Sequence, residues 1–283
     1  MFNTTQKKAF MARYNESTQR VLTSTFELLA PVEEEAGRDI CTFTQEEVRV
    51  ALMQIATTTS MNTTQHKFVA VNQYLTWCVS QGYCEENELA STHITDINLD
   101  DAMRTTMLQS PSDLAHVFND IFYPLDKMTV DNMTRLYFWM VWAGVSTGDA
   151  LCVQHDAVDL LDMSFLYNGK RYVFPKQAHE TVNAAMHMQF ITIFNRDIPR
   201  RTDFSDFSTA VKSSGAATVL AHHQRLARKL AEYDRTPTAR SIKYSGIYYR
   251  MYRDTKEYDR YADTIGRLAM QEYTAWKRVF WEK

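Results

Sequence analysis

AGVSTGDALCVQHDAVDL, residues 143–160, is the stretch of sequence that decides the fold. The pair Ala143-Gly144 is typical of a helix end, and the residues around Leu151 have the pattern of a short amphipathic helix. The acidic, turn-prone residues 156–160 follow. Such a segment closes a helical region and leads into a different kind of structure.

A β-hairpin comes next in the chain. SFLY (164–167) and KRYVF (170–174) are β-rich runs, and they are separated by Asn168-Gly169, the dipeptide that type I′ turns prefer. The hairpin places Lys170 beside its tip.

The order of these elements resembles the start of the catalytic domain of the tyrosine recombinases, the phage integrase family. In that family the segment after the first helix reads Gly-Leu-Arg-x-x-Glu-Ala-Leu, and here residues 144–151 read Gly-Val-Ser-Thr-Gly-Asp-Ala-Leu. Ser146 therefore stands where the resemblance places the first catalytic arginine. An arginine donates two hydrogen bonds to a phosphate and keeps its charge, whereas a serine supplies one hydroxyl and no charge.

The second box of the family, His-x-x-Arg followed by a helical turn of small residues, best matches residues 240–246, RSIKYSG. On this match Arg240 stands where the resemblance implies the histidine, and Lys243 stands where it implies the second arginine. Lysine keeps the positive charge but loses the two-pronged geometry.

The resemblance also suggests candidates for the remaining catalytic groups. The segment 273–276, YTAW, is similar to the box of the nucleophilic tyrosine and makes Tyr273 the candidate, while Thr264 stands where a histidine is often found. Lys170 matches the mobile lysine of the family, with Lys176 as the alternative. The resemblance implies strand cleavage by a tyrosine on a phosphodiester, but both arginines of this chemistry are replaced.

The first half of the chain has the pattern of a small helical bundle. Residues 4–30 predict two helical pieces separated near Asn15, and Pro31 with the acidic residues after it interrupts the pattern. Thr44 with Glu47 forms a capping box for a helix to about residue 56, and a further helix spans 66–81 before Gly82. This plan resembles the helical, SAM-like core-binding domain of the recombinases, although any small helical bundle remains an alternative.

The second half predicts a helix from Ser110 to about 122 and a buried central helix over 128–143. After the hairpin we expect a helix over 177–194, a polar gap with Arg196, and a helix over 216–233. We therefore predict a mainly α fold: a core-binding domain (1–88), a linker (89–101), and a tyrosine-recombinase-like catalytic domain (102–283) with a small β-hairpin or sheet.

Composition restricts the class of protein. The 283 residues are 45% hydrophobic, with few glycines and prolines, as expected for a globular and mostly helical protein. No run reaches the roughly 18 apolar residues that span a bilayer, and no signal peptide is evident, so we expect a cytoplasmic protein of a bacterial or phage-infected cell without a membrane partner. The four cysteines lack the spacing of a metal site or a disulfide framework, and we interpret them as reduced thiols in the core. We expect no metal and no cofactor.

Charge is unevenly distributed along the chain. The total is −3, but residues 201–283 carry 16 basic and 10 acidic side chains, a net charge of +6. Any surface that faces phosphates should therefore depend on this last third. Solvated helix faces, for example with Arg250 pairing Asp254, are the alternative. The candidate DNA-binding residues are Lys170, Lys176, Arg200, Arg201, Arg225, Arg228, Lys229, Arg240, Lys243, Arg250 and Arg253.

Three hypotheses follow from these features. The first is a DNA-binding protein with a tyrosine recombinase fold that is catalytically inactive and regulates transcription in a phage or mobile element, with double-stranded DNA as its partner and a homo-oligomer on DNA left open. The second is an active, divergent integrase that performs DNA recombination and integration through Tyr273. The third, based on the acidic first third, is a protein-interaction module without nucleic acid.

Overall fold

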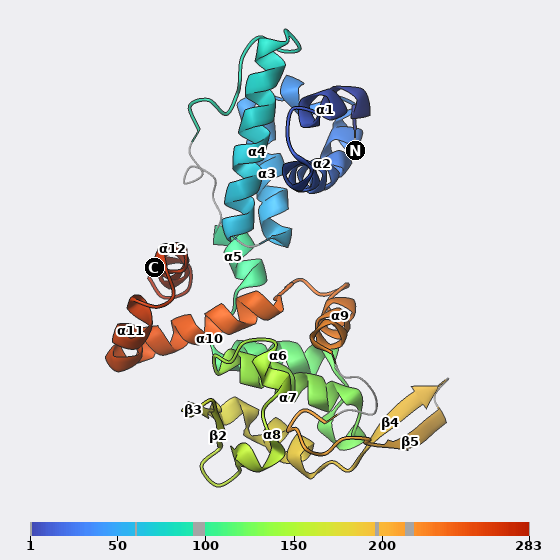
Figure 1. Cartoon of the computed structure of the whole chain (residues 1–283), viewed down its shortest axis with the longest axis vertical. Coiled ribbons are helices and arrows are strands. Elements are labelled where there is room, and N and C mark those ends of the chain that lie inside the picture. The colour runs from blue at the N-terminus through green and yellow to red at the C-terminus, as the bar shows by residue number, and fades with distance from the viewer. Residues whose placement is uncertain (1, 60, 93–99, 196–197, 213–217, 283) are drawn as a thin grey trace. The chain divides into compact units, whose positions relative to one another are not determined.

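The computed structural model describes residues 2–282 apart from 60, 93–99, 196–197 and 213–217. The chain folds as two units, Met1–Met103 and Arg104–Lys283. Helices dominate both units, as predicted (Figure 1). Residues 93–99 of the predicted linker and Arg196 of the predicted polar gap lie outside the described residues.

The first unit is built from helices around an aromatic core. Asn15 separates the first two helices as predicted, because its side chain accepts the Thr18 N–H at 3.0 Å and caps the second. The predicted capping box of Thr44 and Glu47 is present as well. The helices are α1 (Thr4–Met11), α2 (Glu16–Ala36), α3 (Gln45–Thr58) and α4 (Met61–Ser80), with a short 3₁₀ turn at Ile40–Thr42.

The predicted break at Pro31 is wrong, because α2 continues through this proline to Ala36. Glu33, one turn before the end of the helix, is fully buried and pairs with the equally buried Lys7 of α1. Its carboxylate also accepts the Ile40 N–H at 3.0 Å. This ion pair fixes the last turn of α2 in the core and offsets the hydrogen bond that the proline nitrogen lacks.

The start of α4 and the start of the predicted linker both differ from the sequence prediction. Helix α4 begins at Met61, five residues before the predicted start, but it ends before Gly82, whose φ of 74° closes it as expected. Leu89, predicted to begin the linker, is fully buried in the core of the first unit. Cys41 and Cys78 are core thiols as predicted, whereas Cys152 of the second unit is exposed.

The second unit is organised around α7 (Val130–Trp142), the predicted central helix, in which every residue from Asp131 to Trp142 is buried. The predicted helix after Ser110 is α6 (Pro111–Ile121), and Ser110 caps it. The remaining helices are α5 (Asp100–Thr106), α8 (His179–His187), α9 (Val219–Lys229), α10 (Ala239–Arg253), α11 (Thr255–Ala262) and α12 (Arg267–Phe280). The short helix predicted near Leu151 is one 3₁₀ turn, Asp149–Leu151.

The predicted hairpin is confirmed. Strands β2 (Ser164–Tyr167) and β3 (Lys170–Val173) pair in antiparallel register, and Tyr167 lies opposite Lys170. Asn168 and Gly169 both have positive φ, as a type I′ turn requires. A two-residue strand, β1 (Val158–Asp159), pairs with β2 and completes a three-stranded sheet.

The helix predicted over 177–194 is wrong in its second half. Helix α8 ends at His187, and residues that the sequence assigned to helix and polar gap form a second hairpin, β4 (Phe190–Asn195) and β5 (Ile198–Asp203). FITIF in β4 consists of aromatic and β-branched side chains, which favour a strand over a helix. Helix α9 is also shorter than predicted. Among the described residues, no helix is both long enough and apolar enough to cross a bilayer.

Candidate nucleic-acid interface

Helix α10 crosses the end of α7 at very close range. A Cβ at Gly246 of α10 would lie 2.1 Å from the carbonyl oxygen of Trp142, the last residue of α7. Only glycine permits this approach, because any side chain would overlap the α7 backbone. The neighbouring Ser245 accepts the Leu108 N–H at 2.9 Å. The turn of small residues seen in the sequence therefore brings the segment after α7 close to α10.

Ser146 stands in that segment and is hydrogen-bonded to its own neighbourhood. Its hydroxyl donates to Asp149 Oδ2 at 2.6 Å and accepts the Asp149 N–H at 3.2 Å, which caps the 3₁₀ turn. The Tyr167 hydroxyl donates to Asp149 Oδ1 at 2.8 Å. The Ser146 hydrogen bond, the Tyr167 hydrogen bond and the nearby charge of Lys243 hold the pKa of Asp149 below its usual value. Both carboxylate oxygens are thus engaged within the protein.

Lys243 is the cation that reaches this place from α10. It is half-buried, and its charge is near enough to Asp149 to favour the carboxylate. The structure therefore brings Ser146 and Lys243 into the surroundings of one carboxylate.

Arg240 is held by a carboxylate on α12. Its Nη1 and Nη2 donate to the two oxygens of Glu272 at 3.1 Å each, and the Tyr248 hydroxyl donates to Glu272 Oε2 at 2.9 Å. Glu272 is 4% exposed, and the guanidinium also lies 4.6 Å from the ring of Tyr244. Both prongs of this arginine are therefore occupied by the protein itself.

Tyr273 lies on α12 and is buried at 8% exposure. Its ring packs against Tyr248, Tyr258 and Trp276 at centroid distances of 5.7–6.4 Å. Burial raises the pKa of its hydroxyl, which makes the phenolate harder to form. Thr264, where the family often has a histidine, donates its hydroxyl to backbone carbonyls of its own segment.

Arg250 serves the junction of α7 and α10. Its Nη1 donates to the Trp142 carbonyl at 2.8 Å, and its Nε lies 3.7 Å from Glu257 Oε2. Its Nη2 occupies the space beside Gly144, 2.9 Å from where a Cβ would stand, and Gly144 has a φ of 110°. Within the described part of the chain, the carboxylate partner of Arg250 is Glu257 and not Asp254.

The basic residues of α9 are partly engaged. Arg225 and Lys229 lie 3.5 Å and 3.7 Å from the two oxygens of Asp131, which is 2% exposed, and Lys229 also lies over the ring of Tyr123. Arg228 is exposed and donates to the Gln224 carbonyl of its own helix.

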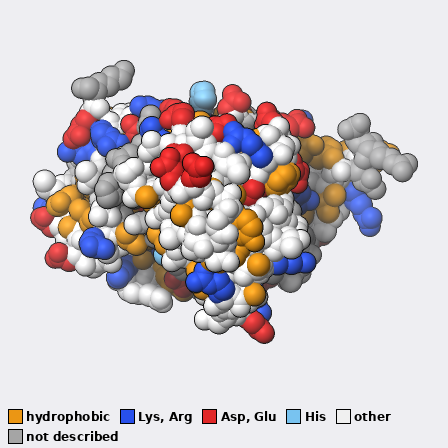
Figure 2. All heavy atoms as spheres, turned by 90° about the horizontal axis from the view of Figure 1, so that it is seen from above, with side chains coloured by type: hydrophobic (Ala, Val, Ile, Leu, Met, Phe, Trp, Pro, Cys, Tyr) orange, Lys and Arg blue, Asp and Glu red, His pale blue; other side chains and the backbone are white. Residues whose placement is uncertain are grey.

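Four candidate cations have exposed side chains with neither a hydrogen-bond acceptor nor a carboxylate partner among the described residues: Lys170, Lys176, Arg200 and Arg253. Arg201 is exposed too, and its pair with Asp203 at 3.1 Å is open to water. On the face drawn in Figure 2, lysine and arginine side chains alternate with acidic ones. These four cations lie at the β2–β3 tip, in the 3₁₀ turn Lys176–Ala178, in β5 and at the end of α10.

Two important carboxylates were not among the candidate residues. Asp149 could have been found from the spacing Ser-x-x-Asp over 146–149, which is that of a cap. Glu272 carried no such signal, because its partner Arg240 is 32 residues away in the sequence.

Comparison with known proteins supports the sequence interpretation for the first unit. Residues 1–81 match the family model "MrpR, N-terminal core-binding domain". The comparison with curated proteins gave no match. A crystal structure of a lambda integrase dimer bound to a COC' core site is similar at a TM-score of 0.43 and 10% identity, over 96% of this chain and 76% of that one. A second, of lambda integrase (75-356) as a dimer bound to the same site, has a TM-score of 0.37 and 12% identity, over 87% and 84%.

The match to the core-binding domain covers the helical part of the first unit. The helices α1 to α4 and the capping residues Asn15 and Thr44 all lie within the matched residues. The first 81 residues are therefore similar to the MrpR N-terminal core-binding domain, in agreement with the core-binding domain predicted for this end of the chain.

Proposed function

We propose that this protein binds double-stranded DNA with a recombinase-like fold, leaves the strands uncut, and regulates a phage or another mobile element. One observation carries the proposal: the hydroxyl of Ser146 caps the turn at Asp149 in the position that the family resemblance gives to an arginine. An arginine acting on a transferring phosphoryl group contributes about 10³–10⁵ in rate. A neutral hydroxyl that is already bonded to a carboxylate cannot supply that charge.

The other catalytic candidates support the same conclusion. Arg240 is engaged by Glu272 through both prongs, and Tyr273 is buried among aromatic rings. A nucleophile must reach the phosphorus atom, and cations must neutralise charge that develops on the phosphoryl oxygens. In this arrangement neither group is free to do so.

DNA binding needs exposed positive charge, and the second unit carries such charge. Lys170, Lys176, Arg200 and Arg253 have exposed side chains with no carboxylate partner among the described residues. Contacts of such residues to phosphates release counterions, and this release makes binding depend steeply on salt. Together with the core-binding domain, they favour DNA as the partner over a protein-interaction role.

Fluorescence anisotropy of the full chain with a labelled random duplex, repeated at rising salt, tests the binding. We expect the logarithm of affinity to fall linearly with the logarithm of salt concentration. Single replacements of the four free cations by alanine should each reduce the slope by about 1. Lys127→Ala, an exposed lysine of the same unit outside the candidate set, is the control. No binding at low salt would refute the proposal.

A nicked duplex that traps covalent intermediates tests the absence of cleavage. We expect no protein–DNA adduct on denaturing gels after prolonged incubation. An adduct that forms with the natural sequence and disappears in Tyr273→Phe would instead establish the active recombinase.

A further inference from the structure

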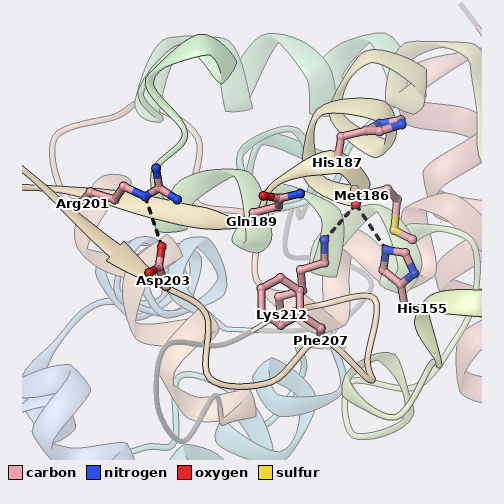
Figure 3. A pocket seen from close by; sticks show the side chains of 8 residues that line it. All are labelled: His155, Met186, His187, Gln189, Arg201, Asp203, Phe207 and Lys212. Carbon is pink, nitrogen blue, oxygen red and sulfur yellow. Dashed lines mark hydrogen bonds and ion pairs between the residues drawn. The ribbon is translucent and has the colours of Figure 1, made fainter.

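A cavity of about 660 Å³ lies beside the end of α8, away from the Ser146 segment (Figure 3). Its wall comes from α8, β5, the 3₁₀ turn at His155–Ala157 and the segment after β5. Cationic and polar side chains prevail in this wall, and Figure 3 shows those of His155, Gln189, Arg201 and Lys212 around one space. Of the candidate DNA-binding residues, Arg201 is the one that lines this cavity.

Lys212 is the unusual residue of this cavity, because it is only 4% exposed. Its Nζ donates to the carbonyl oxygens of Met186 at 2.8 Å and Met188 at 2.7 Å, so that it caps the end of α8. Within the described residues no carboxylate lies at ion-pair distance from it. An ammonium has three hydrogens, and one is left without an assigned acceptor. Burial lowers the pKa of Lys212, which reflects the cost of keeping this charge uncompensated.

The surroundings add hydrogen-bonding groups and leave little unpaired negative charge. His155 Nε2 lies 3.2 Å from the same Met186 carbonyl, and the guanidinium of Arg201 forms another part of the wall. The single carboxylate among the eight lining residues is Asp203, which Arg201 already pairs at 3.1 Å. The ring of Phe207, 5.5 Å from Lys212 Nζ, supplies an apolar side.

We propose that this cavity binds a small organic anion, a molecule whose carboxylate or phosphate group contacts Lys212 and whose apolar part lies against Phe207. The anion would satisfy the remaining Lys212 hydrogen and neutralise a buried charge, and charge-assisted hydrogen bonds of this kind are the strong ones. This proposal does not depend on DNA binding, because neither Lys212 nor Phe207 is among the candidate DNA-binding residues.

Isothermal titration of the full chain with phenyl phosphate, at constant ionic strength, tests the site. We expect saturable binding with a dissociation constant in the millimolar range or below, and weaker binding of inorganic phosphate, which lacks the ring. Lys212→Met should abolish binding, but it also removes the cap of α8. Gln189→Glu is the safer variant, because this exposed residue keeps its size while it adds a carboxylate to the wall.

We expect Gln189→Glu to weaken phenyl phosphate binding at least about tenfold, through like-charge repulsion in a partly desolvated space. Gln81→Glu, an exposed glutamine of the first unit, makes the same change of charge and should have no effect. Equal weakening by both variants, or the absence of saturable binding, would overturn the proposal. So would a loss of duplex DNA affinity in Gln189→Glu that matches the loss of phenyl phosphate affinity, because the cavity would then hold a backbone phosphate.

Discussion

Replacement of Arg240 by glutamine separates a structural role of this residue from a role in binding phosphate. The change removes two hydrogen bonds of 3.1 Å to Glu272 and leaves this carboxylate, at 4% exposure, with the Tyr248 hydroxyl as its remaining partner in the cluster. Breaking a buried ion pair costs about 3–5 kcal/mol. The Arg240 side chain is 38% exposed, so water screens part of the interaction, and we expect a loss of about 2–3 kcal/mol.

Urea unfolding followed by circular dichroism measures this loss in the transition of the second unit, and the melting temperature should fall by roughly 4–12 °C for a unit of this size. The double variant Arg240→Gln with Glu272→Gln should recover part of the stability, because it removes the unpaired buried charge. DNA affinity at moderate salt should change less than about threefold, since the guanidinium is engaged within the protein. Unchanged stability together with a large loss of DNA affinity would refute this reasoning and make Arg240 a phosphate ligand.

Three further predictions concern other contacts. Ser146→Ala should raise the pKa of Asp149 toward its usual value, because it removes a hydrogen bond to the carboxylate. The ionised carboxylate stabilises the fold above the unfolded-state pKa, and this stabilisation is lost as pH falls through the folded-state pKa, so acid destabilisation should begin at higher pH in the variant. An unchanged titration of the Asp149 carboxyl group by NMR would contradict the prediction. Lys7→Met should destabilise the first unit by about 3–5 kcal/mol in urea unfolding, since it leaves the buried Glu33 carboxylate without its cationic partner. An unchanged free energy of unfolding would show that the fold does not need this ion pair. Gly246→Ala should cost about 3 kcal/mol or more in thermal unfolding, whereas Gly148→Ala, which meets nothing within 4 Å, should be nearly neutral.

Local chemistry made much of the fold predictable. Asn168-Gly169 fixed the first hairpin, Thr44 with Glu47 fixed the start of α3, and an uninterrupted apolar run identified α7. These signals act over a few residues, so they can be found without knowledge of distant contacts. The β4–β5 hairpin was missed because residues 188–194 followed a real helix, and the apolar pattern alone did not mark the change of period.

The candidate site was harder to predict, because its chemistry depends on pairs that are far apart in the sequence. The sequence identified Arg240 as a cation near the site, but only the fold shows that Glu272 occupies it. In the same way, α2 continues past Pro31 into a last turn where Glu33 pairs with Lys7, which lies 26 residues earlier in the chain. Long-range ion pairs leave no periodic signal, and sequence patterns therefore place charged residues without saying whether those charges are free.

The crossing of α7 and α10 sets the distance between the Ser146 and Lys243 segments independently of the side chains that those segments carry. Because Gly246 lets the two backbones meet directly at Trp142, the distance between the helices depends on main-chain contact and not on the size of any neighbouring side chain. The side chains at residues 146 and 243 can therefore be substituted while the backbone of these two segments keeps its position. New groups introduced at these two positions would therefore start from a backbone arrangement that Gly246 already sets.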